Sequence, residues 1–434
     1  MSGRTNARTI LERCDELAAI SALPDGLIER TYLTVEHKSA NATVAQWLID
    51  AGLHSIWQDA AGNVCGRLEG ERPGLPALLL GSHLDTVPQA GRYDGILGVL
   101  IAIDVVARIK ASGRTLPFAL EVVGFGDEEG TRFGATLLGS RALAGTWDPA
   151  WWRLTDADGA SLREAFAAFG LDPDGIARAA RRPEDLVGYL EAHIEQGPIL
   201  EQRGRALGLV TSIAGARRML VTVTGRAAHA GTPYAARRDA LAGASEAILA
   251  VESLAPGLGL IATVGRIGAQ PGAVNVVAGS ATFSLDVRAV SDEVRDAGLD
   301  SLLARLGDIC ARRRLSLDVE HTHVAETVHC DPAMKAILAQ GVAATGDEEP
   351  LELFSPAGHD AMAIAALTRV GMLFIRCAGG VSHHPEESVL EEDVALAVDA
   401  MHAAVLSLAE SSESNESNAQ NLPSQSNQPC RVAG

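Results

Sequence analysis

The chain has 434 residues, with 36 Lys and Arg against 55 Asp and Glu, so its formal charge is 36 − 55 = −19. Phosphate-rich partners bind through clustered Lys and Arg, so this balance excludes a nucleic acid or an anionic membrane as the expected partner. At roughly 100 to 200 residues per domain, the length predicts two or three domains.

The N-terminal 20 residues have no long apolar run followed by a small-residue cleavage site, as a cleaved targeting segment would have. Their pattern predicts an amphipathic helix instead. No apolar run approaches the ~18 residues needed to cross a bilayer. We therefore expect a cytoplasmic protein without a membrane partner. Six cysteines lie far apart without a C-x-x-C pair, which predicts isolated thiols and neither a disulfide framework nor a zinc ribbon. They are Cys14, Cys65, Cys310, Cys330, Cys377 and Cys430.

The first half of the chain is predicted to contain a strand, a helix and a second strand. Residues 77–80 (ALLL) form a short apolar strand, residues 96–109 have the length and apolar content of a helix, and residues 118–125 (FALEVVGF) form the second strand. A βαβ unit of this kind is expected to be parallel and right-handed.

The α/β pattern of the first half ends near Ile213 and returns before the C-terminus. Alternating strands and two helices then predict an α+β insert with an antiparallel sheet, and an α/β pattern follows it. The insert has strands at 219–224, 260–264 and 281–288 and helices at 239–254 and 291–312; the later part has helices at 332–344 and 391–409 and an apolar stretch at 371–375.

From Ser411 onward the chain is rich in Ser, Asn and Gln, with too little apolar surface to offset the entropy of ordering. The predicted fold class is α/β, with a mixed, mainly parallel sheet flanked by helices and an inserted α+β domain with an antiparallel sheet. The predicted domains are a catalytic domain in two parts (1–212 and 329–410), an inserted domain (213–328) and a disordered tail (411–434).

Potential metal ligands follow the predicted strands. His83 and Asp85 come just after the first strand, and Glu128 and Glu129 come after the second. Because sites in open α/β sheets form at the carboxyl ends of the strands, we expect both loops to face one crevice. In a His-x-Asp pair the imidazole can bind a metal while the carboxylate holds its other ring nitrogen; a surface-loop histidine is the alternative.

Further candidate ligands allow two interpretations each. Asp94, at the start of the predicted helix, is either a helix N-cap or a carboxylate that bridges two cations. Glu128 and Glu129 are either a solvated loop or the pair that metal-assisted hydrolysis needs, in which one acid holds the cation and the other takes a proton from water. With His193 and His383 they complete a set of N and O ligands that suits Zn²⁺, Mn²⁺ or Co²⁺ and excludes an iron–sulfur cluster.

Seven segments resemble, in order and spacing, the two-metal amidohydrolases that include N-carbamoyl-L-amino-acid hydrolases and allantoate amidohydrolases. These enzymes belong to a wider clan of two-metal aminopeptidases and deacylases. The resemblance runs from about residue 10 to residue 409. The segments are GSHLDTVPQAGRYDGILGVL, GFGDEEGTRFGATLLGSRAL, HIEQGPILE, GRAAHAG, NVVAGSATFSLDVRA, AGHDAM and GGVSHHPEES.

The resemblance implies two divalent metal ions per subunit, Zn²⁺ or Mn²⁺ with Co²⁺ as a further candidate. In it, His83 and His193 hold one ion, Glu129 and His383 hold the other, and Asp94 bridges them. Each ion then has three protein ligands and an open position, as expected of a catalytic site.

The resemblance also implies roles for the residues around the ions. Glu128 is the general base and Asp85 supports His83. His384, next to His383, is an alternative ligand, but the family motif places its ligand directly after the serine, here Ser382.

Two divalent cations carry +4 and their two acidic ligands −2, so the site favours a small anionic substrate. Strand alternation puts Phe283, Leu285 and Val287 on one face of 281–288 and Arg288 on the polar face. There the guanidinium can take a carboxylate in a bidentate pair; a surface arginine is the alternative. The resemblance favours the substrate role for Arg288, and it adds as further substrate contacts Gln196, Arg217, Asn275, Gly358 and His359.

His229 follows the strand at 219–224, where a histidine is usually structural or solvent-facing. The resemblance implies instead that His229 stabilises the oxyanion and reaches across a dimer interface into the partner's site. The expected assembly is therefore a homodimer formed through the inserted domain.

The implied activity is metal-dependent hydrolysis of a ureido C–N bond on a small carboxylate-bearing substrate. Allantoate, giving ureidoglycine, ammonia and CO₂, is the main prediction; an N-carbamoyl-L-amino acid, giving the L-amino acid, ammonia and CO₂, is the alternative. The two substrates differ in the substituent beside the ureido group and the carboxylate, so the pocket that receives it decides between them. A metallopeptidase or deacylase of the same clan is disfavoured by His193 and Gln196, and a non-catalytic binder is disfavoured by Glu128.

Overall fold

A computed structural model describes residues 2–420, of which 2–6 and 413–420 are described by their backbone alone. The chain divides into two compact units. Unit 1 contains the described residues of Met1–Leu209, Asp331–Leu351 and Ala363–Gly434, and unit 2 contains Val210–Cys330 and Glu352–Met362.

Unit 1 is built from helices and strands that alternate along the chain. Its regular elements are α1 (Ser2–Ala18), α2 (Val35–Asp50), β1 (Ser55–Gln58), β2 (Val64–Leu68), β3 (Ala77–His83), α3 (Ile96–Ser112), β4 (Ala119–Phe125), α4 (Leu138–Leu143), α5 (Leu162–Phe169), β5 (Leu186–Ile194), α6 (Ile199–Gln202), α9 (Pro332–Ala343), β16 (Val370–Ile375) and α11 (Glu391–Gln420), with short 3₁₀ turns between them. The strand β6 (Leu207–Ile213) and the short helix α10 (Ala361–Ile364) each contain residues of both units.

The sheet of unit 1 is mixed, as predicted, with strand order β1-β2-β4-β3-β5-β16-β6. Its four central strands, β4, β3, β5 and β16, pair in parallel, and β1, β2 and β6 pair antiparallel at the two edges. The two strands predicted at 77–80 and 118–125 are β3 and β4, and their parallel register runs from Ala77↔Ala119 to His83↔Phe125. Every residue of both strands is buried.

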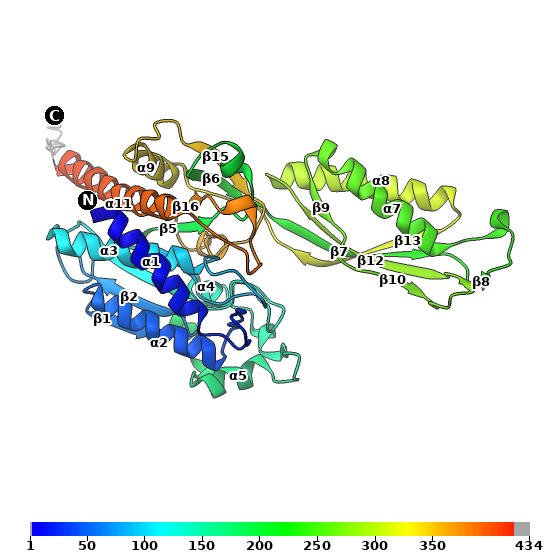
Figure 1. Cartoon of the computed structure of the whole chain (residues 1–434), viewed down its shortest axis with the longest axis horizontal. Coiled ribbons are helices and arrows are strands. Elements are labelled where there is room, and N and C mark those ends of the chain that lie inside the picture. Colours follow the sequence, from blue (N-terminus) through cyan, green and yellow to red (C-terminus); the bar gives the residue numbers. More distant parts are fainter. Residues whose placement is uncertain (1, 421–434) are drawn as a thin grey trace, which may run out of the picture. The chain divides into compact units, whose positions relative to one another are not determined.

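Three helices of unit 1, α1, α3 and α11, pack against one another and cover the sheet (Figure 1). In α1 the buried residues Ala7, Ile10, Cys14 and Leu17 recur at helical spacing, which confirms the predicted amphipathic helix. In α3 most residues are buried, because this helix contacts β3, β4 and β5 on one side and α1 and α11 on another.

The helix α11 is longer than the predicted 391–409. It continues past Ser411 to Gln420, so the first part of the tail that was predicted to be disordered is helical. Extending a helix that packing already holds costs little free energy, because the costly first turn has been formed. The remaining residues of the predicted tail, 421–434, lie outside the described residues. Over Glu391–Ser412 the helix is apolar and long enough to cross a membrane, but Val398 and Val405 are fully buried in unit 1, as in a core helix.

Unit 2 holds the antiparallel sheet expected of the insert. Its elements are β7 (Ala216–Thr224), β8 (Ala228–His229), α7 (Ala240–Leu254), β9 (Ile261–Thr263), β10 (Ile267–Gln270), β11 (Val276–Val277), β12 (Ser280–Arg288), α8 (Asp292–Arg312), β13 (Ser316–Val324), β14 (Val328–His329) and all but the first residue of β15 (Leu351–Ser355). The strand order is β10-β12-β7-β13, and β9 also pairs with β12. The helices α7 and α8 pack on this sheet (Figure 1).

The residues Glu352–Met362 also belong to unit 2, although the sequence prediction of 213–328 did not include them. The physical reason is hydrogen bonding: Thr211 Oγ1 donates to the carbonyl of Leu353 over 3.3 Å, and the amide of Ala214 donates to the carbonyl of Ser355 over 2.8 Å.

Side-chain alternation on β12 follows the prediction. Phe283, Leu285 and Val287 are buried, and Arg288 lies on the half-buried face. Five of the six cysteines are buried thiols outside any disulfide among the described residues, as predicted, and Cys430 lies outside the described residues.

Candidate metal centre

The carboxyl ends of the central strands bring the candidate ligands of unit 1 together. His83 is the last residue of β3, His193 is the last but one of β5, and Glu128 and Glu129 follow β4. Since β4, β3 and β5 are parallel neighbours, these residues lie at one edge of the sheet. Three groups have ligand atoms within 4.8 Å of one another: His83, Asp94 and His193; Asp94, Glu129 and His383; His83, Glu128 and Glu129.

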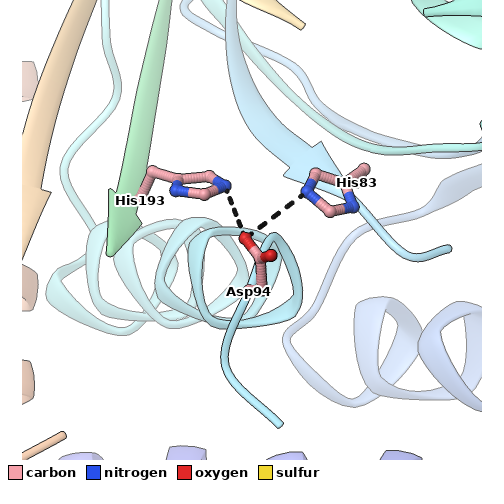
Figure 2. A group of neighbouring side chains, drawn as sticks. All are labelled: His83, Asp94 and His193. Atoms are coloured by element: carbon pink, nitrogen blue, oxygen red, sulfur yellow. Dashed lines mark ion pairs between the residues drawn. The ribbon is translucent and has the colours of Figure 1, made fainter. Parts of the chain in front are cut away.

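Asp94 lies between the two histidines of the sheet (Figure 2). Its Oδ1 is 3.2 Å from His193 Nε2 and 3.9 Å from His83 Nε2. Both histidines turn the other nitrogen to a backbone carbonyl, with His83 Nδ1 3.0 Å from the oxygen of Asp85 and His193 Nδ1 2.9 Å from the oxygen of Ile194. A carbonyl only accepts, so it holds the proton on Nδ1 and leaves the lone pair of Nε2 for a metal.

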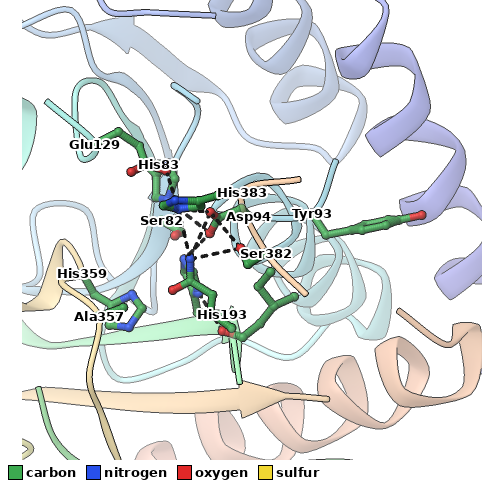
Figure 3. A network of polar contacts seen from close by, with 12 residues as sticks. Ser82, His83, Tyr93, Asp94, Glu129, His193, Ala357, His359, Ser382 and His383 are labelled. Carbon is green, nitrogen blue, oxygen red and sulfur yellow. Dashed lines mark hydrogen bonds and ion pairs between the residues drawn. The ribbon is translucent and has the colours of Figure 1, made fainter. Parts of the chain in front are cut away.

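The second oxygen of Asp94 faces His383 (Figure 3). His383 Nε2 is 3.0 Å from Asp94 Oδ2 and 3.2 Å from Glu129 Oε1. The neighbouring His384 belongs to none of the three ligand groups; its Nδ1 accepts a hydrogen bond from the amide of Glu386. Asp94 therefore has one oxygen directed at each group of ligands.

The residues fit a pair of divalent cations. Asp94 Oδ1 is buried, and its one close partner among the described side chains is the imidazole of His193 at 3.2 Å, so most of the stabilisation that a buried carboxylate oxygen needs is left for a metal to supply. The candidate ligand atoms grouped with it are imidazole nitrogens and carboxylate oxygens, which are typical ligands of Zn²⁺ and Mn²⁺.

The alternative interpretation of Asp94, as a helix N-cap, does not agree with the structure. Gly95 is the N-cap of α3, with φ 71°, and no side chain caps this helix. A side chain at Gly95 would overlap the imidazole of His83. Glycine at this position therefore allows the start of α3 to lie against His83 while the Asp94 carboxylate turns toward the ligands.

Asp85 organises the loop that carries the two glutamates. Its carboxylate accepts hydrogen bonds from the amides of Glu128 (3.0 Å) and Glu129 (3.2 Å), and Oδ1 lies 3.6 Å from His83 Nδ1. Burial raises the pKa of Asp85 to about 6, although these amides and the charge of Arg30 act to lower it. Its contact with His83 is thus made mainly by its backbone carbonyl, and its carboxylate holds the two glutamates.

The contacts among the ligands shift their pKa values. Burial by itself lowers the pKa of His193, but the ion pair with Asp94 and the charge of Glu191 raise it to about 9. The pKa of His383 rises to about 10 because of its contacts with Asp94 and Glu129. Burial acts to raise the pKa of Asp94, but the charged histidines hold it well below its usual value. The pKa of His83 is lowered, mainly by burial.

Arg30 is a residue of this region that the sequence did not point to. It is fully buried, and its guanidinium donates to the carbonyls of Leu84 (2.8 Å) and Leu17 (2.8 Å). Burial lowers its pKa to about 10, and the charge of Asp85 acts to raise it. An arginine in a loop carries no sequence signal for such a position, because its partners are backbone atoms distant in the chain.

Among the predicted substrate contacts, Gln196 belongs to unit 1 and lies beside the candidate metal ligands. Its Nε2 donates to Asp94 Oδ2 (3.1 Å) and to Ser382 Oγ (3.2 Å). It lies two residues after the end of β5, so the strand that carries His193 also positions this amide.

The two predicted arginines of unit 2 already have partners. Arg288 donates through Nε to Asp286 (2.8 Å) and through Nη1 to the carbonyl of Pro356 (2.6 Å). Arg217 donates to the carbonyl of Ala325 (3.1 Å) and to Glu326 (3.1 Å). Arg288 therefore lies close to the segment that contains Gly358.

The remaining predicted contacts of unit 2 lie in two places. Gly358 is exposed and His359 is buried, with its Nε2 2.7 Å from Ser355 Oγ. His229 is exposed on β8, opposite Val276, and the carbonyl of Asn275 accepts from the amide of Ala230 over 2.9 Å. The structure thus brings His229 and Asn275 together.

Comparisons with known proteins give consistent matches over both units. The profile of peptidase family M20/M25/M40 matches residues 79–407. An allantoate deiminase of Arabidopsis thaliana is 40% identical over 432 residues, covering 92% of this chain and 81% of the relative. An N-carbamoyl-L-amino acid amidohydrolase of Geobacillus stearothermophilus is 39% identical over 401 residues, covering 92% and 98%. The crystal structure of an amidase of the hydantoinase/carbamoylase family from Burkholderia multivorans superposes with a TM-score of 0.84 at 32% identity, covering 93% and 98%.

Proposed function

The chain belongs to peptidase family M20/M25/M40, and on this premise we propose that it is a metal-dependent allantoate amidohydrolase that forms ureidoglycine, ammonia and CO₂. The observation that carries the proposal is the gathering of four N and O ligands around Asp94, which is itself the fifth, with Glu128 beside them. The 40% identity to an allantoate deiminase supports the choice of substrate.

In this proposal His83, His193 and Asp94 hold one divalent cation, and Asp94, Glu129 and His383 hold the other. Zn²⁺ and Mn²⁺ suit these ligands best, and Co²⁺ is a further candidate. Bound divalent cations lower the pKa of water from about 15.7 toward 7 and polarise the carbonyl that is attacked.

The chain's own residues supply the proton transfers. Glu128, which groups with His83 and Glu129, takes the proton of the attacking water and passes it to the leaving nitrogen. Asp85 holds the amide of Glu128 at 3.0 Å, and this fixes the loop from which the base acts.

We assign the substrate carboxylate to Arg288, with Asp286 fixing the plane of its guanidinium through Nε. A guanidinium has five donors, and those that Asp286 and Pro356 leave open can bind an anion. The other proposed contacts to the substrate are Gln196, Arg217, Asn275, Gly358 and His359. We further propose that the enzyme is a cytoplasmic homodimer formed through unit 2, in which the exposed His229 stabilises the oxyanion in the partner's site.

The test is a substrate panel on enzyme loaded with Mn²⁺, Zn²⁺ or Co²⁺. The panel contains allantoate, several N-carbamoyl-L-amino acids, ureidoglycolate and N-acetyl amino acids, with ammonia and free amino acid measured separately. We expect allantoate to release ammonia with the highest kcat/KM, and a chelator to abolish turnover until metal is restored. Full activity after complete removal of metal, or peptide hydrolysis without ureido hydrolysis, contradicts the proposal.

The second candidate is hydrolysis of an N-carbamoyl-L-amino acid. It is favoured by the 39% identity to an N-carbamoyl-L-amino acid amidohydrolase of which the match covers 98%. Equimolar release of ammonia and free L-amino acid, with no turnover of allantoate, would establish it. The metal ligands and Glu128 keep the same roles in both reactions, because both substrates place a ureido group beside a carboxylate.

A further inference from the structure

Glu387 is a buried carboxylate that the proposed reaction does not use. It is 3% exposed and follows His383 in a loop of unit 1. Its Oε1 accepts hydrogen bonds from the amides of Tyr93 (2.8 Å) and Asp94 (3.2 Å), and its Oε2 accepts one from Ser382 Oγ (2.9 Å). One carboxylate therefore joins the loop that carries Asp94 to the loop that carries His383.

The space for this carboxylate is provided by a glycine. A Cβ at Gly91 would overlap the carboxyl group of Glu387, so the loop before α3 approaches it without a side chain. A carboxylate is costly to bury unless hydrogen bonds replace its water. Here the replacing donors are the backbone amides of the proposed metal ligand Asp94 and of Tyr93 before it, and the hydroxyl of Ser382, which directly precedes the proposed ligand His383.

The hydroxyl of Ser382 connects Glu387 to Asp94 (Figure 3 shows Ser382, Asp94 and His383). Ser382 Oγ lies 2.9 Å from Glu387 Oε2 and 3.3 Å from Asp94 Oδ2, but it has one proton to donate. When Glu387 accepts this proton, Asp94 Oδ2 keeps its lone pair for a cation. If residue 387 donates to Ser382 instead, the hydroxyl proton turns to Asp94 Oδ2 and competes with the cation.

We propose that Glu387 is a positioning residue that sets the orientation of Asp94 and keeps the proton of Ser382 away from it, for the cation held with Glu129 and His383. This inference rests on the proposed two-cation site. It extends that site to a carboxylate that binds no cation itself, as residues that orient metal ligands commonly do.

The main test is Glu387→Gln. The amide oxygen can still accept from the amides of Tyr93 and Asp94, but the amide nitrogen donates to Ser382 Oγ and reverses that hydrogen bond. We expect calorimetry with Mn²⁺ to show one of the two cations, the one proposed for Glu129 and His383, losing about 10- to 100-fold in affinity. At saturating Mn²⁺ we expect KM to stay within about threefold of wild type, because Glu387 does not contact substrate. The matched control is Glu386→Gln, whose side chain is 83% exposed and should bind both cations normally.

The double variant Glu387→Gln, Ser382→Ala separates positioning from mere structural support. It removes the hydroxyl whose proton Glu387→Gln misdirects, so we expect it to recover part of the lost affinity relative to Glu387→Gln alone. A structural role predicts the opposite, because removing a second hydrogen bond adds to the damage. An equal or weaker affinity in the double variant overturns the proposal.

Gly91→Ala displaces Glu387 without changing its chemistry and gives an independent check. We expect it to weaken the same cation while circular dichroism shows a folded protein. Loss of the folded state in both Gly91→Ala and Glu387→Gln makes Glu387 a structural residue and overturns the inference. Normal binding of two cations and normal turnover by Glu387→Gln also overturns it. Failure of the wild-type protein to bind two cations instead contradicts the proposed function, so the two failures are distinguishable.

Discussion

At the scale of single residues, Asp94 determines what the site can hold. Its Oδ1 faces His83 and His193, and its Oδ2 faces His383. A carboxylate with one oxygen toward each of two nitrogen groups is suited to bridge two cations. Glu129 and Glu128 then differ by their groups, because Glu129 joins Asp94 and His383, whereas Glu128 groups with His83 and Glu129.

The role of Glu128 as the base can be tested by Glu128→Gln. The amide keeps the size of the side chain but cannot take a proton, so we expect kcat to fall about 10²- to 10⁴-fold or more. The metal content, measured by elemental analysis, should remain two ions per chain. A kcat near that of wild type would remove Glu128 as the base and point to another residue.

The raised pKa values of His193 and His383 predict how pH affects the metal-free protein. Both lie above the ordinary value of 6.5, at about 9 and about 10. A group with a raised pKa in the folded state stabilises the fold fully below its unfolded pKa and loses this contribution as the pH rises through the folded value. We therefore expect the free energy of unfolding of chelator-treated protein to decrease between about pH 6.5 and 10.

The control for this pH dependence is His383→Gln, which should show a smaller decrease in the free energy of unfolding because residue 383 then has no proton to give up.

Cation binding needs both imidazoles neutral, so near pH 8 the binding of cations should release about two protons. Calorimetry in buffers of different ionisation enthalpy measures this number. Binding without proton release would show that these histidines are not ligands.

At the scale of elements, the start of α3 shows how a helix positions the site. The helix lies against the sheet, and its first turn approaches the end of β3 closely enough that Gly95 contacts the His83 ring. The same turn carries Asp94, so packing of an apolar helix on the sheet places a carboxylate between two histidines. The apolar core of unit 1 and the geometry of the ligands are thus coupled.

Gly95→Ala tests this coupling, and Gly113→Ala is its matched control. Both glycines flank α3 with φ near 70°, where a Cβ costs roughly 1–2 kcal/mol. At Gly113 a Cβ meets no atom within 4 Å, whereas at Gly95 it overlaps the imidazole of His83. We expect both variants to lose stability in thermal melts, and Gly95→Ala alone to lose the cation proposed for His83. Equal metal binding by both variants would contradict this account.

At the scale of the whole molecule, the proposed residues are divided between the two units. The proposed cation ligands and Glu128 belong to unit 1, whereas His229, Asn275 and Arg288 belong to unit 2. The proposed homodimer supplies His229 from one subunit to the site of the other. This division predicts that two different inactive subunits can complement each other.

Complementation can be measured by mixing Glu128→Gln with His229→Ala and allowing the subunits to exchange. In a mixed dimer, one site keeps its own Glu128 and receives His229 from the partner. If exchange is random and His229 acts between subunits, activity should recover to about one quarter of the wild-type value. Activity no higher than that of the separate variants, once exchange has been verified, would place His229 outside the partner's site.

The sequence alone was enough to predict the elements that carry the site, because periodic burial is a local property. The apolar strands β3 and β4, the helix α3 and the alternation on β12 all follow from the spacing of apolar residues. The ligand types that follow these strands also pointed to a metal, because polar residues at carboxyl ends share one edge of a parallel sheet.

Only the tertiary structure decided which atoms meet. It placed His383 and not His384 beside Asp94, it turned Gly95 against His83, and it paired Arg288 with Asp286. It also brought Glu387 onto the backbone of Asp94, and no pattern in the chain indicated this. The physical reason is that such contacts join loops distant in the chain, whose positions depend on how whole helices and strands pack.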